Sequence, residues 1–199
     1  MEFSFSEHII LENNSVLLRP MEKNDFNDLS GIAYDYDIWR FTVSRCMNDE
    51  ELNDYINTAL KDKSKEARYP LIIISKKNNR IAGSTSFGNI SNKDKRLEIG
   101  WSWLGRKYRG TGVNKHCKFL MLTYAFESLG FERVEFKTDV INGQSRKALK
   151  KIGAVEEGVL RSHTVMQDGR RRDTIYYSIL RSEWAGIKNT VFRDLVLPG

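Results

Sequence analysis

The sequence predicts an α+β (mixed α/β) fold, in which helices flank one sheet. Three segments rich in β-branched and aromatic residues follow one another between residues 70 and 104, as in a β meander. A long apolar helix pattern follows from residue 111 to 129, and strand-like and helix-like segments alternate after it. With 199 residues, 40% hydrophobic content and three prolines, the chain has room for one good core, so we expect a single domain over residues 1–199.

The N-terminal elements are expected from their start and stop signals. Residues 16–20 read as a first strand that Pro20 stops. Asn24-Asp25 offers a cap for a helix that extends through Ile32, and the acidic run 49–51 opens a second helix that extends through Leu60.

The meander consists of a buried strand at 70–74, a turn at 76–79, a strand at 81–90 and a strand at 97–104. In a regular strand the side chains alternate between the two faces. The last strand should then place Glu98, Gly100 and Ser102 opposite an apolar face made of Leu97, Ile99, Trp101 and Trp103.

The C-terminal half begins with the helix at 111–129, which is apolar on most sides and is therefore expected to be largely buried. The elements expected after it are a strand at 134–138, a short helix at 143–152, strands at about 155–166 and 171–180 around an Asp168-Gly169 turn, and an amphipathic stretch at 182–195.

Composition limits the class of protein. No run of eighteen apolar residues and no signal-peptide pattern occurs, so we expect a cytoplasmic protein without a membrane partner. Cys46 and Cys117 are too few for a disulfide framework. Cys117 reads as a small apolar helix residue, whereas Cys46 lies in an expected loop, where it could be exposed and reactive.

The net charge of +6 is unevenly distributed. Residues 1–60 hold 4 Lys/Arg against 12 Asp/Glu, and residues 61–199 hold 28 against 14. Such a split suits an enzyme with a polyanionic cofactor and a cationic amine substrate, although attraction to RNA or plain solubility would also explain it. The basic residues are scattered without a stacking-aromatic motif, so no specific nucleic-acid partner is expected.

The most informative segment is Lys107-Tyr108-Arg109-Gly110-Thr111-Gly112-Val113-Asn114, between the strand at 97–104 and the long helix. Glycines and cations at a helix N-terminus form an anion site, because free N–H groups and the helix dipole both favour negative charge. Gly105 and Gly110 have P-loop spacing, but Thr111 and Gly112 stand where Lys and Ser/Thr are needed. A dinucleotide fingerprint fails because Lys115 replaces its third glycine. A pyrophosphate such as that of coenzyme A remains.

These residues resemble the GNAT superfamily of acyl-CoA-dependent N-acyltransferases. The family's pyrophosphate loop reads Arg/Gln-x-x-Gly-x-Gly/Ala, and residues 107–112 fit it with Lys107 in the first position. The block from Thr138 to Ser145 resembles the RimJ/RimL-type branch, and Glu98-Ile99-Gly100-Trp101 is similar to the family's strand before the loop. The resemblance covers about residues 15–185. It implies a mixed, mostly antiparallel sheet that is splayed at the cofactor site.

The resemblance also implies cofactor contacts. The expected ligand is acetyl-CoA, with no metal, and the pantetheine arm would lie in the gap between strands. The residues expected to contact it are Trp101, Trp103, Lys107, Arg109, Gly110, Thr111, Gly112, Val113, Asn114, Asn142 and Ser145.

Glu98 and Ser145 are the expected catalytic residues. A carboxylate within an apolar strand is a good proton acceptor, and an acidic residue here often serves as a base through water in the family. The alternative is a structural glutamate paired with Lys95 or Arg96. Ser145 would help to protonate the leaving thiolate, because Leu149 stands where many members have a tyrosine acid; alternatively it only belongs to the first turn of a helix.

The acceptor is expected to be a primary amine that attacks directly in a ternary complex. For the RimJ/RimL-type branch a protein N-terminal amine is implied, with a small-molecule amine (polyamine, amino acid or aminoglycoside) or a non-catalytic acyl-CoA sensor as alternatives. Tyr34, Trp39 and His163 are candidate acceptor residues, although each has a structural alternative. Family habit favours a homodimer.

Overall fold

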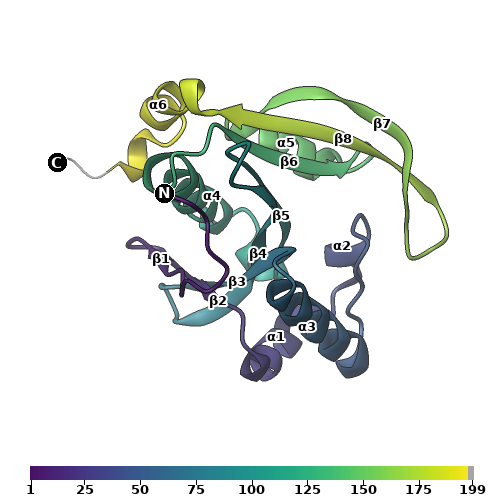
Figure 1. Cartoon of the computed structure of the whole chain (residues 1–199). Coiled ribbons are helices and arrows are strands. Elements are labelled where there is room, and N and C mark those ends of the chain that lie inside the picture. Colours follow the sequence, from purple (N-terminus) through teal and green to yellow (C-terminus); the bar gives the residue numbers. More distant parts are fainter. Residues whose placement is uncertain (197–199) are drawn as a thin grey trace.

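The computed structural model describes residues 1–196, and eight of its strands form one sheet in the order β1-β2-β3-β4-β5-β6-β8-β7 (Figure 1). Neighbouring strands are antiparallel except β5 and β6, which are parallel. The expectation of a mixed, mostly antiparallel sheet is confirmed. The strands are β1 Leu11–Glu12, β2 Val16–Pro20, β3 Arg68–Ser75, β4 Arg80–Ser91, β5 Arg96–Leu104, β6 Arg133–Asp139, β7 Val155–Val165 and β8 Arg171–Leu180.

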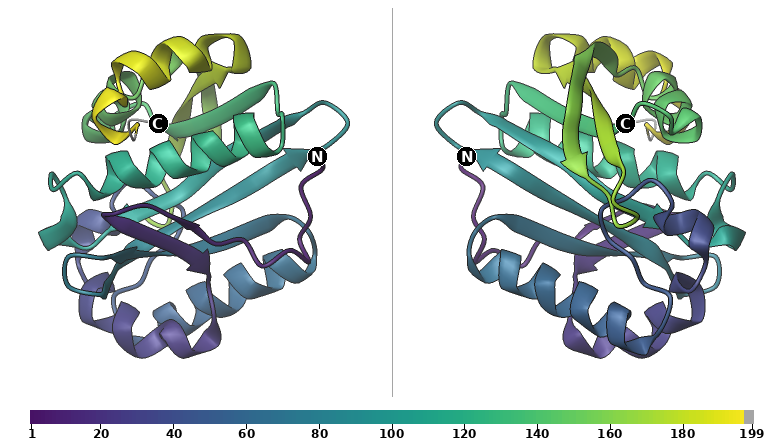
Figure 2. Two further views of the ribbon diagram at one scale, coloured as in Figure 1. Left: turned by 90° about the vertical axis from the view of Figure 1, so that its left-hand side faces the viewer. Right: turned by 90° about the vertical axis from the view of Figure 1, so that its right-hand side faces the viewer.

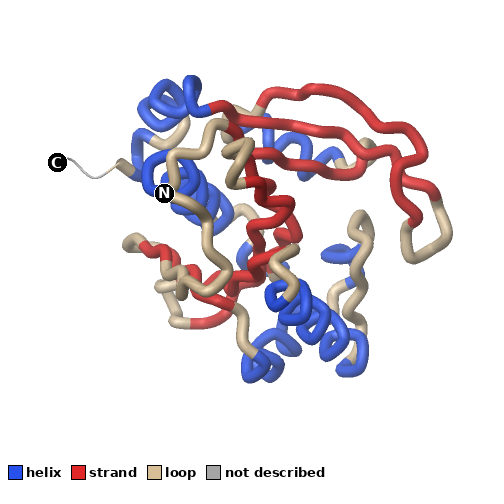
Figure 3. The backbone as a smooth tube through the Cα atoms, viewed as in Figure 1, coloured by secondary structure: helices blue, strands red, loops and turns tan. Residues whose placement is uncertain are grey.

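Helices cover both faces of the sheet (Figure 3). Figure 2 shows α4 crossing one face while α1 and α3 lie beyond the other. The helices are α1 Phe26–Ala33, α2 Tyr36–Trp39, α3 Asp49–Ser64, α4 Val113–Thr123, α5 Gly143–Lys151 and α6 Arg181–Thr190, and a π-helical turn, Tyr124–Ser128, continues α4.

Two apolar clusters hold these layers together. The larger one packs α4, α5 and α6 against the sheet and contains Phe87, Met121 and Phe136. The smaller one lies under α1, α2 and α3 and includes Leu52 and Ile72. The expected helices therefore form because each has an apolar side to bury.

Local signals set the start of the two acidic helices. The side chain of Asn48 accepts a hydrogen bond from the Glu51 N–H (2.9 Å) and caps α3. Asp25 does not cap α1 with its side chain; its carboxylate pairs with Arg19 and accepts from the Glu22 N–H (2.7 Å). It therefore holds the turn that precedes α1.

Strand β5 contains a β-bulge at Trp101. Against β4, Ser84 pairs with Trp103 and Ser86 with Gly100, so one β4 residue faces two on β5, and Trp101 has a φ of +50°. The expected alternation therefore stops at the bulge. Leu97 and Ile99 pack on the α4 side, whereas Trp103 packs on the α1/α3 side. The prediction that both tryptophans share a face with Leu97 and Ile99 is wrong.

Strands β5 and β6 separate soon after they pair. Only Arg96–Glu98 of β5 pairs with β6, at residues 133–135. Beyond Glu98, β5 follows β4 and β6 follows β8. The sheet is therefore splayed at its centre, as expected.

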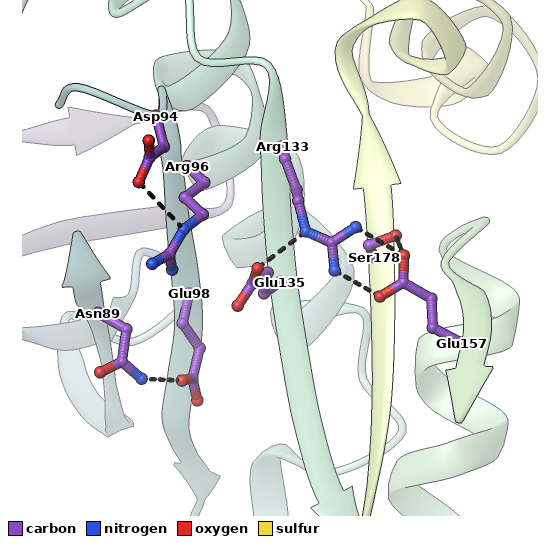
Figure 4. A network of polar contacts seen from close by, with 8 residues as sticks. All are labelled: Asn89, Asp94, Arg96, Glu98, Arg133, Glu135, Glu157 and Ser178. Atoms are coloured by element: carbon purple, nitrogen blue, oxygen red, sulfur yellow. Dashed lines mark hydrogen bonds and ion pairs between the residues drawn. The ribbon is translucent and has the colours of Figure 1, made fainter. Parts of the chain in front are cut away.

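The β7–β8 hairpin is anchored at both ends. Near its base, the Arg133 guanidinium on β6 bonds Glu135 (2.8 Å) and Glu157 (2.6 Å), which ties β6 to β7 across β8 (Figure 4). At its tip, the Gln167 side-chain amide donates to the carbonyls of Thr42 (3.0 Å) and Ser44 in the loop after α2. The hairpin and this loop thus lie on either side of the splayed strands.

Candidate active site

A cavity of about 570 Å³ lies at the gap between β5 and β6. Its wall is built from these two strands, the glycine loop before α4, the start of α5, the loop after α2 and the β7–β8 hairpin. The volume lies in the range of small-molecule and cofactor sites. Most residues expected from the sequence to act together meet here.

The glycine loop forms one end of this cavity, and Gly110 and Asn114 line it. Gly112 is the N-cap of α4 with φ +90°, and Gly110 has φ +75°, a region that residues with a Cβ rarely adopt. Open space surrounds the position of a Cβ at Gly110, so the backbone conformation rather than crowding requires glycine. His116 makes the first N–H bond of α4, to the Gly112 carbonyl (3.1 Å), which leaves the N–H groups of residues 113–115 without intrahelical acceptors.

The cations of the loop differ in position. Arg109 lines the cavity, and its guanidinium donates to the Leu104 carbonyl (3.1 Å) and lies 3.7 Å from Asp35 Oδ2. Lys107 is exposed, with its ammonium 5.4 Å from the centre of the Tyr108 ring, and it does not line the cavity.

The other expected loop residues act on the loop itself. The Thr111 hydroxyl donates to the Tyr108 carbonyl (2.7 Å), and the Val113 side chain packs in the larger apolar cluster. Thr111, Gly112 and Val113 do not line the cavity. Their side chains shape the turn, and their N–H groups lie at the N-terminus of α4, where the helix dipole favours an anion.

Lys118 is a site residue that the sequence reasoning missed. Its side chain is buried in the wall of the cavity, and its ammonium donates to Ser102 Oγ (2.7 Å). Burial lowers the pKa of this lysine. A lysine one turn after Asn114 in an otherwise apolar helix is the signal that would have found it.

Glu98 is buried at the point where β5 and β6 separate, with 3% of its surface exposed. Its carboxylate accepts from Asn89 Nδ2 (2.5 Å; Figure 4) and pairs with Lys137 Nζ (2.9 Å). Arg96, one expected partner, lies instead 3.9 Å from Asp94. Lys137 and Asn89 were not expected, because they come from two other strands.

Gly100 makes room for this carboxylate. An added Cβ at Gly100 would lie 2.6 Å from Glu98 Oε1, closer than any ordinary contact. The absence of a side chain at Gly100 therefore leaves space for the Glu98 carboxylate.

The tryptophans of β5 form an aromatic wall on the same side as Glu98. The Arg68 guanidinium lies between the rings of Tyr55 (5.4 Å) and Trp101 (5.1 Å), and Trp103 Nε1 donates to the Tyr55 hydroxyl (3.1 Å). Both Trp101 and Trp103 line the cavity as expected, although the bulge turns them to the opposite face of the strand.

Asn142 and Ser145 lie side by side at the start of α5, and both line the cavity. Asn142 Oδ1 accepts from the Ser145 N–H (3.0 Å), so Asn142 caps the helix. Ser145 Oγ makes no hydrogen bond to any residue in the range 1–196 and is free for a ligand. Leu149 is buried and also lines the cavity, so it offers no proton donor there.

The expected acceptor residues separate into two groups. Trp39 is buried and lines the cavity, with its indole N–H bonded to the Ala33 carbonyl (2.7 Å). His163 also lines it, with Nδ1 3.1 Å from Thr174 Oγ1. Tyr34 lies outside, where its hydroxyl donates to Asp49.

Both cysteines are buried, so the expectation that Cys46 could be exposed is wrong. Cys46 packs with the smaller apolar cluster, and burial raises the pKa of its thiol to about 12. Burial also raises the pKa of Cys117. Neither thiol is arranged as a nucleophile.

Within residues 1–196 no three His, Cys, Asp or Glu side chains are grouped as metal ligands. Over the same range, every helix is too short or too polar to cross a membrane.

The chain is similar to known acetyltransferases. Residues 15–155 match the family model described as acetyltransferase (GNAT) domain. The Bacillus subtilis protein named "Putative ribosomal N-acetyltransferase YdaF" is 34% identical over 108 residues, which span 54% of this chain and 58% of that protein. The "Uncharacterized N-acetyltransferase p20" of Bacillus licheniformis is 28% identical over 88% of this chain and 98% of its own. The solved structure of a GCN5-related N-acetyltransferase from Brucella melitensis has a TM-score of 0.89 at 25% identity, covering 98% of this chain and 89% of that one.

Proposed function

Because this chain belongs to the GNAT family of N-acetyltransferases, we propose that it transfers an acetyl group from acetyl-CoA to the N-terminal amine of a protein. The observation that carries the proposal is that one cavity joins the glycine loop at Gly110 to the carboxylate of Glu98. The proposed anion site and the proposed base therefore line the same cavity.

Acetyl-CoA binding is assigned to the loop end of the cavity. The N–H groups of residues 110–114 and the Arg109 guanidinium would hold the pyrophosphate, and Lys118 adds a further positive charge to the same wall. The gap between β5 and β6 would take the pantetheine arm, with Asn142 and the two tryptophans of β5 beside it.

The reaction needs a neutral amine, a polarised thioester and a proton for the leaving thiolate. Glu98 is the proposed base, and it would take the proton of the attacking amine through a water molecule. Asn89 and Lys137 position its carboxylate. Ser145, with its unbonded hydroxyl, is the proposed relay to the thiolate.

The choice of a protein N-terminus rests on similarity to the B. subtilis relative, whose printed name includes "ribosomal N-acetyltransferase". The cavity also reaches the loop after α2 and the β7–β8 hairpin, which would lie along an acceptor chain. Small-molecule amines and a non-catalytic acyl-CoA sensor are the alternatives.

The test is calorimetry with acetyl-CoA followed by an acceptor screen with mass-shift detection. The screen contains N-terminal peptides, polyamines, amino acids and aminoglycosides. Acetylation of peptide N-termini is the expected result. Turnover with small amines alone would contradict the protein acceptor, and tight acetyl-CoA binding without any turnover would favour the sensor.

A further inference from the structure

Arg172 on β8 is a buried cation that makes no ion pair with any residue from 1 to 196. It lines the cavity together with Glu98, Lys137 and His163, and only 8% of its surface is exposed. Burial lowers the pKa of its guanidinium, against the opposing influence of Asp139. A buried charge is costly unless something pairs with it.

The contacts of Arg172 leave four of the five N–H donors of its guanidinium unused. Its Nε donates to Thr174 Oγ1 (2.9 Å), the same oxygen that lies 3.1 Å from His163 Nδ1. Its two terminal nitrogens make no hydrogen bond and no ion pair with any residue from 1 to 196. The side chain is thus oriented from one side and open on the other.

The acids near Arg172 already have other partners. Asp139 pairs with Arg170 (2.6 Å) and accepts from the Ile141 N–H (3.1 Å). Glu98 is held by Lys137 and Asn89. Neither is within ion-pair distance of Arg172, so residues 1–196 supply no ion-pair partner for it.

We propose that the acceptor amine itself carries a carboxylate and that Arg172 binds this carboxylate while Glu98 serves the amine. This inference rests on the proposed function and narrows its substrate class. The planar guanidinium presents two parallel N–H donors that match a carboxylate. Among protein acceptors, this selects a chain with an acidic residue near its N-terminus. A free amino acid, from the alternative class of small amines, is the other source of the same carboxylate. Polyamines and aminoglycosides are disfavoured, because the cavity lining carries the cations Arg109, Lys118, Lys137 and Arg172 against the anions Asp37 and Glu98 and so repels additional positive charge.

The test compares matched acceptors that differ only in one charge. Peptides beginning Ser-Asp and Ser-Asn form one pair, and free glutamate and glutamine form the other. If the wild type accepts a pair, we expect its kcat/KM for the acidic acceptor to be about ten- to a hundredfold higher than for the matching amide acceptor. This ratio corresponds to the free energy that is typical of a hydrogen bond to a charged group. The peptide pair and the amino-acid pair distinguish the two sources of the carboxylate.

Variants then assign the preference to Arg172. Arg172→Gln should remove the preference, so that the ratio of kcat/KM between the acidic and the amide acceptor falls to about one, and Arg172→Lys should keep part of it. Arg171→Gln is the matched control, because Arg171 is exposed and its Nε bonds Ser162 Oγ (2.7 Å); it should keep the preference. Acetyl-CoA affinity should be the same in all four proteins.

The outcomes separate the two proposals. Equal rates for acidic and amide acceptors in the wild type, or an unchanged preference in Arg172→Gln, would overturn the role of Arg172 while leaving the acetyltransferase reaction intact. Weaker acetyl-CoA binding by Arg172→Gln would also overturn it, because the arginine would then serve the cofactor. If Arg172→Gln does not fold, the wild-type ratio and Arg172→Lys decide. Acetyl-CoA binding without turnover of any amine would overturn both proposals.

Discussion

Gly100→Ala should reduce catalysis by moving Glu98 while leaving the fold in place. The added Cβ would lie 2.6 Å from Glu98 Oε1, whereas a close carbon–oxygen contact is about 3.3 Å, so the carboxylate must move by roughly 0.7 Å or more. That shift disturbs its bonds to Asn89 (2.5 Å) and Lys137 (2.9 Å). A displacement of about 1 Å at a catalytic group costs on the order of a hundredfold in rate.

The effect of Gly100→Ala on stability should be small, because the clashing atom is the end of a flexible side chain. A weakened charge-assisted hydrogen bond costs about 1.5–3 kcal/mol, and replacing glycine recovers about 0.5–1 kcal/mol. The free energy of unfolding should therefore fall by about 0.5–2.5 kcal/mol, which corresponds to roughly 1–10 °C in Tm for a chain of this size.

The assay measures initial rates with acetyl-CoA and the acceptor found in the screen, together with acetyl-CoA affinity by calorimetry. Gly31→Ala is the matched control, since its Cβ would meet nothing within 4 Å; it should keep full activity. Repeating Gly100→Ala in a Glu98→Ala background completes a double-mutant cycle, in which the second change should have no further effect. Equal rate losses in both backgrounds, or a loss of acetyl-CoA affinity, would refute the reasoning.

Three further predictions concern the site and its surroundings. Glu98→Gln should lower kcat by a factor of about 10²–10⁴ at unchanged acetyl-CoA affinity, as expected for loss of a general base. Undiminished turnover of the acceptor found in the screen would contradict that role. Asn114→Asp places a carboxylate in the first turn of α4, where it stabilises the helix by up to about 1 kcal/mol but repels the pyrophosphate. Thermal stability should therefore be kept, while the acetyl-CoA affinity measured by calorimetry should fall. An unchanged affinity would argue against the loop assignment. Burial raises the pKa of Cys46 to about 12, and Cys117 is also buried. A thiol reagent at pH 8 should therefore label neither cysteine in the folded protein and both cysteines in denaturant. Rapid labelling of the folded protein would be inconsistent with this burial.

Local signals in the sequence predicted what depends on neighbouring residues. The glycine-rich start of α4 and the short helix at 143–152 were predicted from such signals. The cap that Asn142 provides to this helix was not predicted, because Asn142 was expected to contact the cofactor. The order of the longer elements and the burial of α4 followed from periodicity, which reports which side of a segment is apolar. The short elements β1 and α2 were not predicted, so the strand expected first, at residues 16–20, is the second. The homodimer remains a prediction.

Features that depend on distant partners were missed. The bulge at Trp101 exists because of how β5 pairs with β4, and alternation along β5 does not reveal that pairing. Cys46 was expected in an open loop, but the packing of α3 buries it.

The sequence by itself determined the family resemblance, the anion loop and the identity of the acid at position 98, because each is written in a short run of residues. Only the tertiary structure decided what surrounds that acid. Asn89 of β4 and Lys137 of β6 contact its carboxylate, and Arg172 of β8 lines the same cavity as Glu98 and Lys137; this arrangement follows from strand order and from the divergence of β5 and β6. Pairing and charge balance are properties of distances between strands, and no local pattern encodes those distances.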